Sequence, residues 1–557
     1  MSDANTSVAQ QTSHTVTRLS IIRDVSLKTL DSMSSDDLAN PACVEKAVLK
    51  SVNSEIEMVN AVAPKGAQKF KYLDAMLPAQ IADAIVRSGR VVKIAAAGMS
   101  EDKDLDVLAV YRDEGPYKGI YDTSEVTMRS LVRKYNYNIT KRDAAEVMAV
   151  LQEMLPRVPV CTEPNLVAVN NGIFDYETKK LLPFSPDYVF MSKCKVDYDG
   201  NAQNVTIHND DDGTDWDVES WMESLSDDPE VVNVLWEILG AIIRPLVPWN
   251  KSAWFYSEQG NNGKGTLCEL MKQLCGEESY ASIPLSDFGK DFMLEPLMRA
   301  SAIIVDENDV GTYIDKAANL KAVITGDTIQ INRKFKAPIA YKFRGFMVQC
   351  LNEMPRIRDK SDSFFRRQLF IPFTKCFTGN ERKYIKADYL HRKEVLEYVL
   401  KRVLNMSYYS LSTPKACDAT LEEYKEFVDP VRAFLADVMP ALRWDFVPSA
   451  FLYDLYVKWY QRNIGNDRNI KGKNGFLKDV RLLIKSYYPE WEESPKPVHA
   501  GTMMQTPEPL IAEYMLENWF SPGIRISDMR NNLPVEKTCI PAQATSYRGF
   551  RRVAVSD

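Results

Sequence analysis

The feature that most constrains the fold is a glycine-rich segment between a short apolar run and a helical pattern. The segment reads SAWFYSEQGNNGKGTLCELMKQL over residues 252–274. The chain has only 24 glycines in 557 residues, yet Gly260, Gly263 and Gly265 fall within a span of six residues. Glycine permits tight turns and close approach to the backbone. A strand that passes through such a turn into a helix predicts an α/β domain, with the turn at the end of a sheet strand.

This loop has the chemistry of a phosphate site. Consecutive backbone N–H groups can surround phosphate oxygens, and the positive end of the following helix adds attraction. Lys264 is expected to reach the β- and γ-phosphates of ATP, and Thr266 to offer its hydroxyl to Mg²⁺. The expected phosphate-binding residues are Gly260, Asn261, Asn262, Gly263, Lys264, Gly265 and Thr266.

The loop departs twice from the usual pattern G-x-x-x-x-G-K-[ST]. Glu258 stands where the first glycine is expected, and Gly265 separates Lys264 from Thr266. The simpler alternative is a glycine-rich helix start that binds no ligand.

A second motif places two carboxylates after an apolar run. The run ASAIIVDEND over residues 300–309 ends in Asp306 and Glu307. A buried strand that ends in two acids is costly unless something pairs with them. Asp306 is expected to hold Mg²⁺ through water and Glu307 to polarise the attacking water, which fits hydrolysis rather than binding alone. An ordinary strand end that meets solvent is the alternative.

Polar residues accompany two later β-like runs. GFMVQCLNEMP places Asn352 after an apolar run, where it is expected to contact the γ-phosphate or the attacking water. DSFFRRQLFIPF places Arg366 and Arg367 beside another run. An arginine presented to a neighbour's γ-phosphate accelerates hydrolysis by orders of magnitude. A salt-bridged or solvated edge is the commoner role of such a pair.

Composition excludes several other classes of protein. Hydrophobic residues make up 45% and the net charge is −7, so a nucleic acid must be bound by a local patch. The nine scattered cysteines form no C-x-x-C pair and there are four histidines, so we expect neither a disulfide framework nor a zinc site. The N-terminus lacks a signal pattern, and the most apolar stretch, 231–249, contains Glu237, Arg244 and two prolines. We therefore expect no membrane span and a cytoplasmic location, in the host if the chain is phage-encoded.

The motifs occur together in an informative order. GNNGKGT, IIVDEN, LKAVITGDTIQINRKFKAP, VQCLNEMP and SFFRRQLFIPF resemble those of superfamily 3 helicases of the AAA+ class. More specifically, the chain resembles the phage and plasmid primase-helicase family, which is related to the poxvirus primase-helicase. The resemblance covers roughly residues 110–557 and is most specific over 250–375. It implies a ring, usually a hexamer, that hydrolyses ATP with Mg²⁺ at subunit interfaces and pulls single-stranded DNA through its pore.

The resemblance also implies a role for each motif residue. Asn352 becomes the sensor, and one of Arg366 and Arg367 becomes a finger that acts in trans, with Arg367 favoured. The implied catalytic residues are Lys264, Asp306, Glu307, Asn352, Arg366 and Arg367, and the implied metal ligands are Thr266 and Asp306.

A basic hairpin is expected between the acidic motif and Asn352. The segment TIQINRKFKAPIAYKF over residues 328–343 alternates on both sides of a basic centre. In a ring, the tips of such hairpins would line the pore, where basic groups follow the DNA backbone and an aromatic ring stacks on bases. A charged, exposed hairpin is the alternative. The expected DNA-binding residues are Arg333, Lys334, Phe335 and Lys336.

We predict five regions along the chain. Basic residues near the C-terminus suit contact with duplex or origin DNA, or docking of a protein. The regions are a tail over 1–17, an unassigned part over 18–110, a mostly helical collar over 111–248, an AAA+ motor over 249–428 and a winged-helix-like domain over 429–557.

The predicted function is that of an ATP-dependent helicase that replicates phage or mobile-element DNA. Its expected partners are single-stranded and forked DNA, further copies of the chain in a homo-hexamer, and a replication initiator, a primase or a single-strand-binding protein. The first alternative is a primase-helicase with unrecognised priming residues. Asp104 and Asp106 have only His14 and His208 available within residues 1–250, so a complete primase domain is not expected. The second alternative is an origin-binding protein that uses ATP as an assembly switch without unwinding.

Overall fold

The computed structural model describes most of the chain: residues 17–64, 66–95, 106–334, 336–465, 470–499, 506–520 and 544–553, with Met504, Gly523, Arg525 and Ser527. Residues 1–16 of the predicted tail and Phe335 of the predicted hairpin lie outside this description. The chain divides into two compact units, Met1–Glu353 with Ile371–Pro414 and Met354–Phe370 with Lys415–Asp557. The five regions predicted from the sequence divide the chain differently and stay a prediction.

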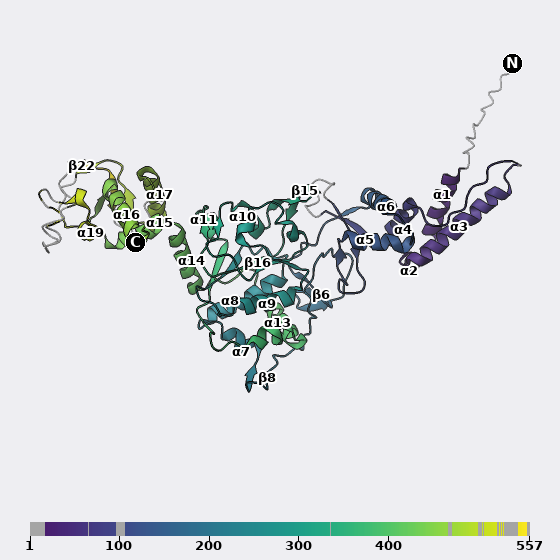
Figure 1. Cartoon of the computed structure of the whole chain (residues 1–557), viewed down its shortest axis with the longest axis horizontal. Coiled ribbons are helices and arrows are strands. Elements are labelled where there is room, and N and C mark those ends of the chain that lie inside the picture. Colours follow the sequence, from purple (N-terminus) through teal and green to yellow (C-terminus); the bar gives the residue numbers. More distant parts are fainter. Residues whose placement is uncertain are drawn as a thin grey trace, which may run out of the picture. The chain divides into compact units, whose positions relative to one another are not determined.

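Helices open the first unit, in the part that the sequence left unassigned. α3 (Pro41–Ala61) buries Val44, Val48, Val52 and Ile56, which recur at every fourth residue along one face. Full burial of one such side chain is worth about 1.5–3 kcal/mol relative to exposure. The helices that share this core are drawn in purple and blue in Figure 1. They are α1 (Arg18–Asp31), α2 (Ser35–Leu38), α3, α4 (Pro78–Ser88), α5 (Glu125–Tyr135) and α6 (Lys141–Met154).

A small sheet follows these helices, in the strand order β3-β2-β1-β4. Its strands are β1 (Val91–Ile94), β2 (Val107–Tyr111), β3 (Tyr121–Asp122) and β4 (Arg157–Val158). The buried Asp106 forms an ion pair with Arg157 at 2.7 Å between Oδ2 and Nε. This carboxylate, considered above for priming, therefore has a structural partner, and Asp104 lies outside the described residues.

The region 111–248 contains both helices and strands. It contains α5, α6, α7 (Val218–Glu223) and α8 (Pro229–Ile243), and also the strands β5 (Leu166–Val169), β6 (Gly172–Asp175), β7 (Lys180–Leu182), β8 (Ile207–Asn209) and β9 (Thr214–Trp216). The apolar runs on both sides of Asn170–Asn171 pair as antiparallel strands. The chain turns between these two strands at Asn170–Asn171. Gly172 itself lies in β6, where a Cβ would be 2.5 Å from the Leu182 carbonyl oxygen.

A five-stranded sheet confirms the predicted α/β alternation (teal and green in Figure 1). The strand order is β11-β12-β16-β10-β18, and β10, β16 and β12 pair in parallel. From β10 the chain crosses to β11 at one edge of the sheet, returns through β12 and β16, and then continues beyond β10 to β18 at the other edge. The strand order therefore reverses beside β10. Open α/β sheets bind ligands at the carboxyl ends of the strands at such a switch point. The strands are β10 (Ser252–Tyr256), β11 (Tyr280–Ala281), β12 (Ala302–Val305), β16 (Phe346–Leu351) and β18 (Gln368–Pro372).

Helices and short segments surround this sheet. The helices are α9 (Lys264–Cys275), α10 (Ala318–Thr325), α12 (Lys383–Ala387) and α13 (Lys393–Leu404), and the 3₁₀ turns are η2 (Leu285–Asp287), η3 (Glu295–Met298) and η4 (Tyr389–His391). The predicted basic hairpin is confirmed as β14 (Thr328–Arg333) and β15 (Lys336–Lys342), antiparallel with Thr328 opposite Lys342. β13 (Tyr313–Ile314) lies between the acidic motif and α10 in the chain.

The second unit combines helices with a small antiparallel sheet. Phe434, Tyr456 and Phe476 meet at its core, and the rings of Tyr456 and Phe476 stack at 4.5 Å. Its sheet has the order β19-β23-β20. The helices are α11 (Asp362–Phe365), α14 (Lys415–Val428), α15 (Pro430–Val438), α16 (Ser449–Asn463), α17 (Lys473–Tyr487) and α19 (Pro509–Glu513). The strands include β17 (Arg356–Ile357), β19 (Phe446–Pro448), β20 (Trp491–Glu493), β21 (Val498–His499), β22 (Ser546–Tyr547) and β23 (Gly549–Arg552).

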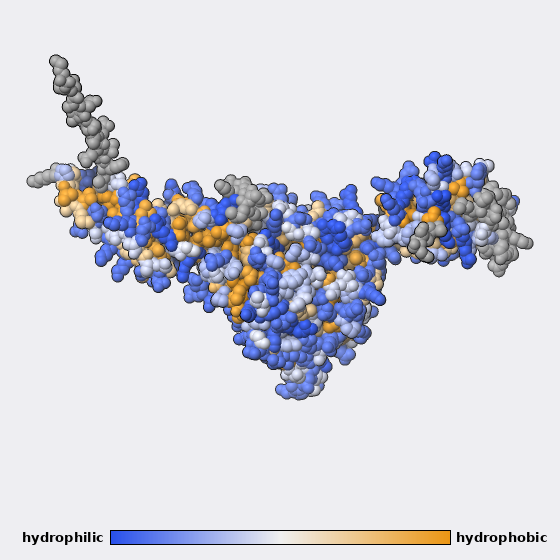
Figure 2. Space-filling view, turned by 180° about the vertical axis from the view of Figure 1, so that it is seen from behind, coloured by the Kyte–Doolittle hydropathy of each residue, from blue (hydrophilic) through white to orange (hydrophobic). Residues whose placement is uncertain are grey.

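The helices and one exposed hairpin bear on how the chain meets its surroundings. Among the described residues, no helix has the length and apolar character needed to cross a bilayer. The β8–β9 hairpin projects from the first unit, with Asp210, Asp211 and Asp212 exposed at its turn. Figure 2 shows this tip as hydrophilic.

Candidate functional site

The glycine-rich loop joins β10 to α9, as the sequence predicted. Asn261 and Gly263 have φ values of 54° and 87°, and only a turn of this kind places α9 directly behind the strand. The buried Asn262 holds the turn together, because its amide donates to the Gln259 carbonyl oxygen and its Oδ1 accepts from the Lys264 backbone N–H at 3.3 Å. Glu258, at the departure from the expected glycine, is exposed and accepts a hydrogen bond from the Tyr256 hydroxyl at 3.0 Å.

Lys264 links the loop to the predicted sensor. Its Nζ donates to Asn352 Oδ1 at 3.0 Å and to the Ser257 carbonyl oxygen at 3.3 Å. The side chain is buried, and this burial lowers the pKa of the ammonium group. The parallel pairing of β10 and β16 brings the two residues together, since both follow the carboxyl ends of these neighbouring strands.

Asp306 follows β12 and has a partner that the sequence analysis missed. Its Oδ2 lies 2.6 Å from Lys272 Nζ, on α9. Its Oδ1 is buried without a hydrogen-bond partner from nitrogen or oxygen groups of the described residues, and the Cys268 thiol lies beside the carboxylate. Lys272 raises no signal in the sequence, because it is one of many helical lysines and its role depends on the packing of α9 against β12.

The two residues that follow Asp306 behave differently. Glu307 is exposed, whereas Asn308 is buried. Asn308 Nδ2 donates to Gln349 Oε1 and to the Cys350 carbonyl oxygen, each at 3.0 Å. Asn308 therefore fixes the end of β12 against β16 and sets the position of the acidic pair. The only sign of this role in the sequence is weak, an asparagine directly after two acids.

Magnesium is compatible with this set of residues. Among the described residues, no group of three or more His, Cys, Asp or Glu side chains gathers as a metal cage. Mg²⁺ typically takes one or two carboxylates and completes its shell with water and substrate phosphates. Asp306 Oδ1 is buried and accepts no hydrogen bond from nitrogen or oxygen groups of the described residues, so it has the chemistry of such a ligand.

A cleft of about 810 Å³ opens beside the phosphate loop. This volume lies within the range of small-molecule sites, about 300–1,000 Å³. Asn261, Gly263 and Thr266 form one wall. The other wall includes side chains that the sequence analysis missed, among them Trp221, Phe377, Arg382, Lys383 and Lys386.

The second wall is attached to the loop by hydrogen bonds. The Phe377 backbone N–H donates to the Asn261 carbonyl oxygen at 2.7 Å, and Asn261 Nδ2 donates to Glu381 Oε1 at 3.1 Å. A Cβ added at Gly263 would lie 3.7 Å from the Phe377 ring. The segment that carries Phe377 therefore stays against the loop.

The remaining predicted residues occupy two other places. Arg333 is half-buried and Lys334 is exposed at the end of the β14–β15 hairpin. Arg366 and Arg367 belong to the second unit, between α11 and β18. Arg366 is exposed, whereas Arg367 donates through Nη1 to the Ser363 carbonyl oxygen.

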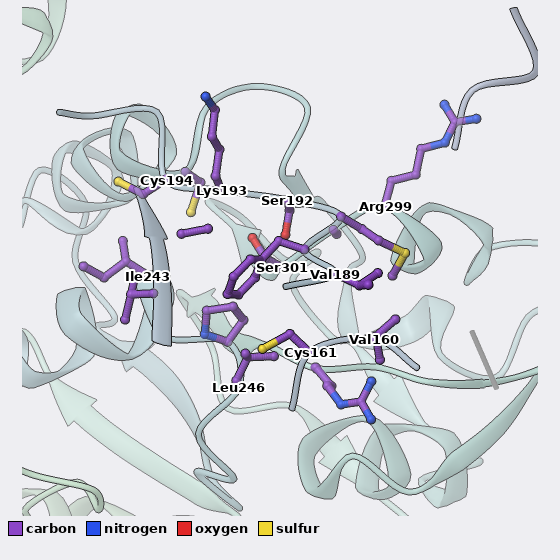
Figure 3. Close-up of a pocket in the computed structure, with 18 of the residues that line it drawn as sticks. Val160, Cys161, Val189, Ser192, Lys193, Cys194, Ile243, Leu246, Arg299 and Ser301 are labelled. Carbon is purple, nitrogen blue, oxygen red and sulfur yellow. The ribbon is translucent and has the colours of Figure 1, made fainter. Parts of the chain in front are cut away.

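A smaller cavity of about 80 Å³ lies elsewhere in the first unit (Figure 3). Val160, Cys161 and Leu246 are among its lining residues, while the charged ends of Lys193 and Arg299 extend away from its interior. The volume is far below that of typical ligand pockets. None of the predicted site residues lines it, so the cleft beside the phosphate loop is the better candidate site.

Comparisons with known proteins cover both the motif region and the part before it. A family described as "D5 N terminal like" matches residues 91–227, and a family of unknown function, DUF5906, matches residues 255–367. A protein of Acanthamoeba polyphaga mimivirus named "Putative helicase L207/L206" is 24% identical over 372 residues, or 59% of this chain. The match spans only 36% of the mimivirus protein.

Solved structures give a weaker likeness. The A form apo structure of the NrS-1 C terminal region is 14% identical, with a TM-score of 0.41, and the match covers 86% of this chain and 100% of that one. Another apo structure of the same region has a TM-score of 0.42 at 14% identity, with 86% and 99% covered.

The family relationship rests on the sequence matches. The D5-like segment precedes the motifs, and the DUF5906 segment contains the phosphate loop, the acidic pair, the hairpin and Asn352. Together with the mimivirus helicase match, they support a relationship to the phage and viral primase-helicase family, which the motifs resemble.

Proposed function

We propose that the chain is the motor of an ATP-dependent DNA helicase of superfamily 3 and the AAA+ class. In this proposal it forms a ring, translocates on single-stranded DNA and unwinds duplex during replication of a phage or mobile element. The contact of 3.0 Å between Lys264 and Asn352 carries the proposal, since it joins two motifs at the carboxyl ends of parallel strands. Asp306 and Glu307 follow the adjacent strand, β12.

ATP suits the cleft and the loop beside it. The loop N–H groups and Lys264 would bind the β- and γ-phosphates. The nucleoside would occupy the 810 Å³ cleft, where the half-buried Phe377 offers an aromatic face. Asn352 would exchange its hydrogen bond with Lys264 for contact with the γ-phosphate or the attacking water.

Hydrolysis requires the acidic pair at the end of β12. Thr266 and Asp306 would hold Mg²⁺, which neutralises negative charge on the transferred phosphate when it is bound. Lys272 holds Asp306 Oδ2 and thereby orients the carboxylate. Glu307 is exposed and would accept the proton of the attacking water.

The β14–β15 hairpin would contact single-stranded DNA in the pore. Lys334 is exposed at its end and Arg333 is half-buried. Phe335 and Lys336 complete the set of DNA-binding residues predicted from the sequence. Cations that neutralise phosphates bind DNA without reading its sequence.

The arginine finger would come from the second unit of a neighbouring subunit. The exposed Arg366 is available to a neighbour, whereas Arg367 hydrogen-bonds the Ser363 carbonyl oxygen of its own chain. We therefore propose Arg366 in place of Arg367, which the sequence favoured. The finger would stabilise charge on the γ-phosphate in the transition state.

The C-terminal part of the second unit would act as a winged-helix domain. The helices α15, α16 and α17 and the antiparallel sheet β19-β23-β20 support this assignment. Lys473, Lys478 and Lys485 are exposed along α17, which suits duplex DNA. A replication initiator, a primase or a single-strand-binding protein remains a proposed partner.

Displacement of a labelled strand from a forked DNA duplex tests the proposed function. Wild-type protein should displace the strand only with ATP and Mg²⁺. Lys264→Ala should lose displacement, because it lacks the cation at the phosphates. Lys393→Ala, which removes an exposed lysine outside the cleft, is the matched control and should unwind normally. Equal displacement by a folded Lys264→Ala protein would contradict the proposal, and duplex binding with no displacement by wild type would favour the assembly switch.

A further inference from the structure

Gly265 is the one departure in the phosphate loop that the proposed function leaves unexplained. Loops of this pattern carry serine or threonine at that position. Gly265 lies in the first turn of α9. Its backbone has no positive φ that would require glycine. The reason for the glycine must therefore lie in what faces it.

The group that faces Gly265 is the ammonium of Lys386. A Cβ built at Gly265 would have Lys386 Nζ as its nearest neighbour, at 3.6 Å. Lys386 also lines the cleft together with Gly263 and Thr266. Because glycine has no side chain, the space above the helix start is open to this cation.

The fold holds Lys386 in this place through its short helix, α12. Ile385 is buried, and the Tyr384 hydroxyl donates to Asp212 Oδ2 at 2.6 Å. The Lys386 carbonyl oxygen lies 3.1 Å from His391 Nε2. The preceding segment is attached to the phosphate loop at Asn261. The backbone of Lys386 is thus anchored while its side chain stays exposed.

Lys386 forms no ion pair within the part of the chain that the structure describes. A second cation, Lys264, is buried at the start of α9. Two cations near one helix N-terminus favour an anion between them, and a polyphosphate brings several negative charges.

We propose that Lys386 is a second phosphate-binding cation, supplied by the same subunit, and that Gly265 leaves the space through which it reaches the phosphates. The inference rests on the proposed ATP site. It assigns Lys386 to the phosphate chain rather than to the base or ribose.

Binding titrations of the full chain with two probes, ATP and inorganic tripolyphosphate, each with Mg²⁺, test the proposal. Lys386→Met should weaken both probes by the same factor, about tenfold for one charge-assisted contact. Lys386→Arg should recover part of the loss because it keeps the charge. Lys393→Met, an exposed lysine that pairs with Glu397 outside the cleft, should bind both probes as wild type does.

The outcomes separate the inference from the proposed function. If wild type binds ATP and Lys386→Met binds both probes equally well, Lys386 is not a phosphate ligand and the proposed function stands. A loss for ATP without a loss for tripolyphosphate would place Lys386 at the nucleoside and overturn the inference. If wild type binds neither probe, the proposed ATP site itself is wrong. Thermal unfolding without ligand checks that Lys386→Met and Lys386→Arg fold as wild type does.

Discussion

The two walls of the cleft are built by the chain in different ways. The wall formed by the phosphate loop is one continuous motif, and its turn, its lysine and its helix start are adjacent in the sequence. The opposite wall joins side chains from two distant segments, such as Trp221 and Phe377, that only the fold brings together. The groups that would bind phosphate are therefore neighbours in the sequence. The groups that would contact the rest of the ligand come from distant segments, and the fold alone brings them together.

The largest effect should come from substituting the acidic motif in one variant and the arginine finger in another. Asp306→Ala and Arg366→Ala should each lower DNA-stimulated ATP hydrolysis by about 10³-fold or more, the range for an arginine finger. If the finger acts in trans, a mixture of the two variants contains interfaces with both groups intact and regains part of the activity. Steady-state hydrolysis at increasing mixing ratios measures this recovery.

The same mixture made with Arg367→Ala identifies the finger. Recovery with Arg367→Ala but not with Arg366→Ala would restore the residue that the sequence favoured. A mixture as inactive as its components in both cases would contradict action in trans.

A smaller effect is expected on the opposite wall. Phe377→Ala removes a half-buried ring beside Gly263 but keeps the backbone hydrogen bond to Asn261. It should weaken ATP binding by about three- to tenfold, the value of about 1 kcal/mol for one aromatic contact, and leave tripolyphosphate binding unchanged. Phe427→Ala, which removes an exposed ring in the second unit, is the control. An equal loss of affinity for ATP and for tripolyphosphate would contradict the proposed difference between the two walls.

The sequence predicted the parts of the fold whose signals are local. The strand, turn and helix around Lys264 and the β14–β15 hairpin occur where predicted. The alternation of strands and helices over the sheet is also confirmed, because each strand is a short buried run. The region predicted as a collar also contains short paired strands such as β5 and β6, which have few residues each.

The sequence could not predict contacts that depend on register and packing. Lys272 reaches Asp306 because α9 packs against β12, and Asn308 reaches Gln349 because β12 pairs with β16. Lys386 lies beside Gly265 although the two residues belong to segments that are far apart in the sequence. None of these residues has a motif of its own, so their roles follow only from the fold.

The measurement that tests the central claim most directly compares Glu307→Gln with wild type, with ATP binding and DNA-stimulated ATP hydrolysis measured on the same samples. The claim is that the strand ends form a site that hydrolyses ATP. We predict that Glu307→Gln keeps ATP binding and lowers hydrolysis by about 10²–10⁴-fold, the usual contribution of a general base. Asp309→Asn, an exposed acid two residues further on, should hydrolyse ATP as wild type does. Unchanged hydrolysis by a folded Glu307→Gln protein would contradict the account.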